Sequence, residues 1–173
     1  VWGLVGSTYA RFAGFFPTPG RILAYLGGRW QGLGHNPLGA LSIFALLGFV
    51  AWQVGSGLFS NDDIAFDGFL ADLVSKDTSD RLTGLHRQGL WPIVGLVALH
   101  VTAAFYYLLV KRQNLIGPMF TGKKVGPSDA AARQGGFIAL LFAVLVAAVA
   151  AWAASGVWIP APPPPPPAAL PAW

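Results

Sequence analysis

The stretch LHRQGLWPIVGLVALHVTAAFYYLLV, residues 85–110, decides the fold of this chain. An α-helix rises about 1.5 Å per residue, so roughly 20 apolar residues cross a hydrocarbon core about 30 Å thick. The only charged residue of the stretch is Arg87, which lies close to its beginning. Residues 85–110 are therefore predicted to form a membrane-spanning helix.

Two histidines, His86 and His100, lie fourteen residues apart within this stretch. Fourteen helical residues make about four turns less 40°, so both imidazoles project from nearly the same face, roughly 21 Å apart along the axis. Ionisable groups inside a spanning helix are costly and tend to be functional, and imidazole is a usual axial ligand of haem iron. The pair indicates one haem near each leaflet, whereas a lone histidine there is more often an interfacial residue.

Two further segments, residues 38–59 and 136–158, are also long and apolar enough to cross a membrane. The 173-residue chain is 54% hydrophobic and 10% charged, with a mean hydropathy of +0.56, which is too apolar for an ordinary soluble domain. We therefore expect an all-α integral membrane protein, an antiparallel transmembrane helix bundle of three complete spans preceded by the end of another helix. Residues 1–16 lack the features of a signal peptide, so we expect upstream sequence to be missing.

The chain contains no cysteine, which excludes disulfides, thiolate-ligated iron–sulfur clusters and covalently attached c-type haem. Any haem is therefore expected to be b-type. The formal charge of +4 and the pI near 9.8 do not predict nucleic-acid binding, because the basic residues flank apolar spans.

The basic residues are divided unevenly between the two ends of the spans. Three precede the first span and five lie between the second and third, whereas only Lys76, Arg81 and Arg87 lie on the other side. By the positive-inside rule, the 60–84 loop and the proline-rich tail at 160–173 face outward. We expect a multi-pass protein of a bacterial inner membrane, with these two segments in the periplasm.

The outer loop, residues 60–84, combines apolar residues with six of the seven acidic residues of the chain, which are Asp62, Asp63, Asp67, Asp72, Asp77 and Asp80. This mixture predicts a short amphipathic helix on the membrane surface. An acidic rim would steer a basic electron carrier such as a soluble cytochrome c. The alternative, that acidic residues merely populate outer loops, is equally open.

Several residues of the 85–110 stretch are of types that commonly line a cofactor-binding site. Gly89 and Gly95 allow close approach, and Arg87 is placed to pair with a haem propionate, although an interfacial anchor is the more ordinary role for such an arginine. The other two spans contain no ionisable side chain, which favours electron transfer or a structural role over ion transport. The tail at 160–173 predicts polyproline II, as a spacer or a docking segment.

Four stretches, in this order and spacing, resemble the bacterial di-haem cytochrome b561 family, which includes the cytochrome b subunits of Ni/Fe-hydrogenases. They are VWGLVGSTYARF at 1–12, GHNPLGALSI at 34–43, LTGLHRQGLWPIVGLVALHVTAAFYY at 82–107 and VKRQNLIGPMFTGKK at 110–124. The resemblance implies that residues 1–124 are a partial haem-binding membrane domain without its first helix and most of its second. Residues 125–159 would add one transmembrane helix, and 160–173 the tail.

In this family one helix gives a histidine to each of two b haems, so the resemblance assigns His86 and His100 as iron ligands, with Arg87 beside the first. The opposing ligands would lie outside this chain. His35 matches a recurrent position but is not expected to be an axial ligand. The resemblance implies an electron-transfer subunit, not a stand-alone enzyme, linking a soluble cytochrome c or a dehydrogenase or hydrogenase subunit to a quinone or cytochrome. The alternative is a haem-free scaffold subunit among other membrane subunits.

Overall fold

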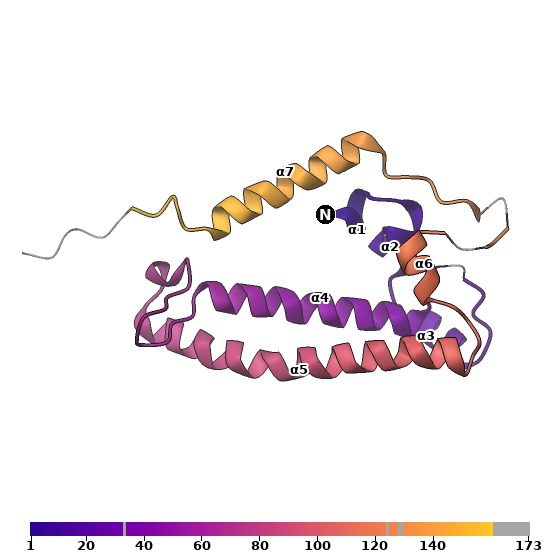
Figure 1. Ribbon diagram of the computed structural model, residues 1–173, viewed down its shortest axis with the longest axis horizontal. Coiled ribbons are helices and arrows are strands. Elements are labelled where there is room, and N and C mark those ends of the chain that lie inside the picture. The colour runs from indigo at the N-terminus through magenta and orange to yellow at the C-terminus, as the bar shows by residue number, and fades with distance from the viewer. Residues whose placement is uncertain (33, 124, 128–129, 161–173) are drawn as a thin grey trace, which may run out of the picture.

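The computed structural model describes residues 1–32, 34–123, 125–127 and 130–160 (Figure 1). Over these residues the protein is helical and has no strand, only an isolated antiparallel bridge between Asn61 and Asp67. The helices are α1 (Trp2–Val5), α2 (Phe12–Phe15), α3 (Pro19–Leu26), α4 (Pro37–Leu58), α5 (Lys76–Leu109), α6 (Ile116–Thr121) and α7 (Gly136–Ala154), with 3₁₀ turns η1 (Thr8–Ala10) and η2 (Ala71–Leu73). The predicted all-α class is confirmed. The predicted proline-rich tail lies outside the described residues except for Pro160.

Three helices, α4, α5 and α7, are long and apolar enough to cross a membrane, as predicted. The Asn36 side chain caps α4 by accepting a hydrogen bond from the Gly39 N–H at 2.7 Å. Helix α5 begins at Lys76 rather than at residue 85, because Ser75 caps it there. At about 1.5 Å per residue α5 is roughly 51 Å long, so its polar first turns extend beyond a hydrocarbon core about 30 Å thick.

Helices α4 and α5 lie side by side and antiparallel over the length of α4 (Figure 1). At one end the Asn36 amide donates a hydrogen bond to the Tyr107 hydroxyl at 3.2 Å. At the other end the Asn61 N–H, just beyond α4, donates to the Thr83 hydroxyl at 3.0 Å. Residue numbers therefore increase along α4 in the direction in which they decrease along α5. The two hydrogen bonds agree on one pairing register along the length of α4.

A polar corner, made of Asn61, Ser79 and Thr83, closes the connection between α4 and α5. Asn61 and Ser79 are both buried, with relative exposures of 7% and 4%. The Asn61 amide donates hydrogen bonds to the Ser79 hydroxyl at 2.6 Å and to Asp80 at 2.9 Å. The Ser79 hydroxyl in turn donates to the Phe59 carbonyl at 2.6 Å. These bonds tie the end of α4 to the second and third turns of α5.

The outer loop does not form the predicted amphipathic helix, so that prediction is wrong. An Asp62 carboxylate oxygen instead accepts hydrogen bonds from the three N–H groups of residues 64–66, at 2.8 to 2.9 Å. These donors favour the ionised carboxylate and hold the pKa of Asp62 below its usual range. A side chain that binds backbone N–H groups in this way competes with helix formation, and only the turn η2 is helical between α4 and α5.

Residues 1–15, expected as the end of a preceding helix, form the short segments α1, η1 and α2. They bind the segment before α7: the Tyr9 hydroxyl donates to the Ala130 carbonyl at 2.7 Å, and the Thr8 N–H donates to the Arg133 carbonyl at 3.1 Å. Figure 1 shows α7 apart from the α4–α5 pair, and none of its residues is buried. Its apolar surface is suited to lipid or to a further helix.

The polar corner generates a stability prediction. Asn61→Ala should lower the free energy of unfolding by about 1–3 kcal/mol, because it removes a buried amide that serves two acceptors on α5. The measurement is the thermal unfolding midpoint of the full-length native protein in detergent, which should fall. Asp72→Ala, at an exposed carboxylate of the same loop, is the control and should leave the midpoint unchanged. A midpoint unaltered by Asn61→Ala would rule out this role.

Candidate functional site

The imidazole of His86 is half-buried and faces α4, which supplies partners for both ring nitrogens. Nδ1 lies 2.9 Å from the carbonyl oxygen of Gln53 and 3.2 Å from the hydroxyl of Ser56. Nε2 lies 3.1 Å from the side-chain nitrogen of Gln53. Helix α4 therefore holds this ring in one orientation.

These partners determine which nitrogen of His86 carries the proton. A carbonyl oxygen can only accept, so the short contact with Gln53 requires Nδ1 to be the donor. The Ser56 hydroxyl gives its own proton to the Trp52 carbonyl at 2.8 Å, so it too acts as an acceptor towards Nδ1. Nε2 then has the lone pair and accepts from the Gln53 amide. A metal-bound histidine has the same arrangement, with one nitrogen donating to a carbonyl and the other free to ligate.

The Gln53 side chain stands at the position from which a metal would approach Nε2. Its own oxygen, Oε1, is buried and has no hydrogen-bond partner among the described residues. A buried acceptor without a partner is unfavourable, so a rotation of this amide away from the ring would give up one hydrogen bond and release Oε1 from an unfavourable position. The residues present therefore fit a haem ligand: a neutral imidazole, fixed through Nδ1, whose lone pair is covered only by a flexible side chain.

Two glycines make room for this arrangement. A Cβ atom on Gly57 would lie 2.8 Å from Cε1 of His86, and one on Gly89 would lie 2.5 Å from Oε1 of Gln53. Gly89 therefore allows a close approach of α4, whereas its predicted place beside a cofactor stays a prediction. At Gly95 no described atom lies within 4 Å of a Cβ placed there, so the space beside it is open and its role beside a cofactor stays a prediction. Helix contact is therefore tight around His86 and looser towards the middle of α5.

The other candidate residues are not joined to the His86 cluster. His100 is half-buried and has no hydrogen bond or ion pair within the described part of the chain. Arg87 is exposed, and no ion pair joins it to any residue that the structure describes. His35 lies at the opposite end of α4, where its ring packs at 4.7 Å from the ring of Phe15. The structure thus details the surroundings of one predicted ligand, His86.

The sequence analysis missed Ser56 and the pairing of Gln53 with His86. A signal was available, because Gln53 and Ser56 are polar side chains three positions apart in a helix whose one other polar side chain is Ser42. Such residues in a spanning helix usually face a partner rather than lipid. What the sequence does not contain is the partner, because that depends on the register between α4 and α5.

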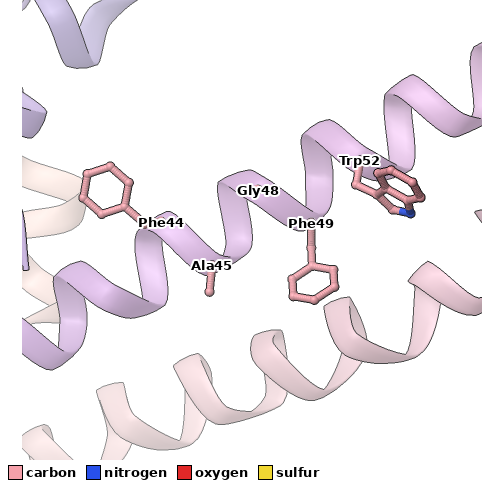
Figure 2. A pocket seen from close by; sticks show the side chains of 5 residues that line it. All are labelled: Phe44, Ala45, Gly48, Phe49 and Trp52. Atoms are coloured by element: carbon pink, nitrogen blue, oxygen red, sulfur yellow. The ribbon is translucent and has the colours of Figure 1, made fainter.

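A shallow apolar hollow of about 340 Å³ lies along α4, lined by Phe44, Ala45, Gly48, Phe49 and Trp52. Figure 2 shows these side chains spread along one helix, with Gly48 leaving the space between Phe44 and Trp52. The surface suits a flat apolar group or a neighbouring helix. It has few polar groups to orient a ligand and specifies none by itself.

Comparison with known proteins identifies relatives of this chain. The family described as prokaryotic cytochrome b561 matches residues 27–122, more than half of the chain. A probable Ni/Fe-hydrogenase B-type cytochrome subunit of Rhodobacter capsulatus is 28% identical over 107 residues, covering 56% of this chain and 40% of that protein. Proteins of the same description from Azotobacter vinelandii and Azotobacter chroococcum mcd 1 are 32% identical, covering 56% of this chain and 43% of theirs.

The chain spans about two fifths of the length of these curated relatives. Comparison with solved structures gave no significant match. Both His86 and His100 lie within the matched residues.

The glycine contacts generate a prediction about His86. Gly57→Ala should displace the imidazole, because the added methyl group would lie 2.8 Å from Cε1. If His86 ligates iron, the haem b content of the full-length native protein should fall by about half. The measurement is a pyridine haemochrome assay against protein mass. Gly55→Ala, where a Cβ meets nothing within 4 Å, is the matched control. Equal haem content in both variants would contradict the prediction.

Proposed function

We propose that this chain, which belongs to the prokaryotic cytochrome b561 family, is part of a membrane-embedded b-type cytochrome that transfers electrons. The observation that carries the proposal is the environment of His86 on a helix suited to span a membrane. Its Nδ1 donates to the Gln53 carbonyl, which leaves Nε2 as the potential ligand atom. The second histidine, His100, follows fourteen residues later on the same helix.

His86 and His100 would each hold the iron of one b haem, which gives about two haems. Haem, when bound, supplies a one-electron iron couple. This chain would orient the imidazoles, exclude water from them and separate the two sites by roughly 21 Å along the helix axis. Arg87, exposed beside His86, is placed to pair with a propionate. The opposing ligands would come from outside this chain.

The proposed partner is a hydrogenase or dehydrogenase subunit, because the curated relatives are described as hydrogenase cytochrome subunits. Electrons would pass between that subunit, or a soluble cytochrome c, and a quinone or cytochrome. Four exposed carboxylates of the outer loop make no ion pair among the described residues, namely Asp62, Asp67, Asp72 and Asp77. They would speed the encounter with a basic partner surface. By the positive-inside rule, this face would lie outside a bacterial inner membrane.

A second function, that of a haem-free accessory subunit, is favoured by one observation. Both ring nitrogens of His86 already have hydrogen-bond partners on α4. In this alternative, His86 and Gln53 would form a structural polar contact between two spanning helices, and the exposed α7 would bind a neighbouring subunit.

Haem content separates the two functions. The full-length native protein should contain about two b haems per chain, and His86→Ala and His100→Ala should each lose about one. The measurement is a pyridine haemochrome assay with a reduced-minus-oxidised spectrum. His35→Ala, at the histidine next to Phe15, is the control and should keep both haems. A parent protein without haem would establish the accessory role, and equal content in all variants would place the ligands elsewhere.

A further inference from the structure

We infer that Ser56 and Ser42 are the positioning residues of His86 and His100. Each serine hydroxyl would accept a hydrogen bond from the Nδ1–H of the histidine opposite and so set the electron donation of the ring to iron. The inference rests on the proposed function, because it concerns histidines that bind haem.

The first pair is present in the structure. Ser56 is 3% exposed, and its hydroxyl lies 3.2 Å from Nδ1 of His86. Its single proton is directed to the Trp52 carbonyl at 2.8 Å. A lone pair of the hydroxyl is therefore left to accept from the imidazole.

The second pair follows from the register of the two helices. Ser42 precedes Ser56 by fourteen residues on α4, and His100 follows His86 by fourteen residues on α5. The helices are antiparallel and have the same rise per residue. A step of fourteen residues from the Ser56–His86 contact, backwards along α4 and forwards along α5, therefore brings Ser42 and His100 to the same level of the pair. The same register holds beyond them, where Asn36 contacts Tyr107.

Among the described residues, neither member of the second pair has a hydrogen-bond partner. The Ser42 hydroxyl is buried and makes no hydrogen bond to any described residue. His100 likewise makes none within the described residues. A buried hydroxyl without a partner is unfavourable and calls for an explanation. A rotation of the two side chains towards each other would satisfy both groups at once.

The chemical consequence is a lower reduction potential. An acceptor on Nδ1–H makes the imidazole a stronger donor at Nε2, which stabilises oxidised iron relative to reduced iron. His86 would keep the Gln53 carbonyl as a second acceptor if Ser56 were removed. His100 has no second acceptor among the described residues. Loss of the Ser42 hydroxyl should therefore change the potential more than loss of the Ser56 hydroxyl.

The test uses the full-length native protein with Ser42→Ala or Ser56→Ala, each compared with the corresponding serine-to-threonine variant, which keeps the hydroxyl. The measurements are redox titration of both haems and low-temperature electron paramagnetic resonance. Each alanine variant should raise the midpoint potential of one haem, a different haem in each case, with the larger rise in Ser42→Ala. Threonine should restore the parental potential. The haem affected in Ser42→Ala should be the one that is lost in His100→Ala.

The possible failures are distinguishable. Two haems with unaltered potentials and resonance spectra in Ser42→Ala would overturn the inference and leave the proposed function standing. If Ser42→Ala loses one haem and Ser42→Thr keeps it, the inference is supported. If both variants lose that haem, the serine acts through packing and the inference is overturned. A parent protein without haem would overturn the proposed function, and the inference with it.

Discussion

The antiparallel register between α4 and α5 is the constraint on which the rest of the structure depends. Two apolar helices in lipid gain little from hydrophobic contact with each other, so their relative position must come from polar bonds and close packing. The polar corner provides such bonds at one end, through Asn61 and Ser79. At the other end, Asn36 and Tyr107 provide a further bond. Between these ends, neither helix can slide by a turn without breaking both.

This register converts separate sequence positions into one site. It brings Gln53 and Ser56 to the ring of His86, and it places Gly57 where any larger residue would collide with that ring. The same contacts select the ring tautomer, because a carbonyl oxygen can only accept a hydrogen bond. The surroundings of His86 thus follow from helix pairing and not from local conformation.

Much of the hydrophobic surface of the described chain remains uncovered. Helix α7 buries no residue, and Trp91, on the histidine-bearing helix, is 74% exposed. Such surfaces are expected of helices that meet lipid or other helices. The N-terminal segment covers one end of α4, where Phe12 and Phe15 pack against Phe44, and its hydrogen bonds from Thr8 and Tyr9 join it to the loop before α7. The α4–α5 pair is therefore the part of the fold that is organised by its own contacts.

The sequence by itself determined the all-α class, the three apolar helices and the shared face of His86 and His100. These features follow from local periodicity and from the length of apolar runs. It did not determine the start of α5. The helix begins after the Ser75 cap, nine residues before the apolar stretch begins at residue 85. The sequence also failed at the outer loop, where the Asp62 carboxylate binds backbone N–H groups that a helix would have used.

Only the tertiary structure decided what faces His86. Residues 53 and 86 are far apart in the chain, and their contact depends on how one helix is set against another. Nothing in either helix alone encodes that offset. It is imposed by hydrogen bonds at the two ends of the pair, which form only when both helices are in place, because each bond needs a donor from one helix region and an acceptor from the other.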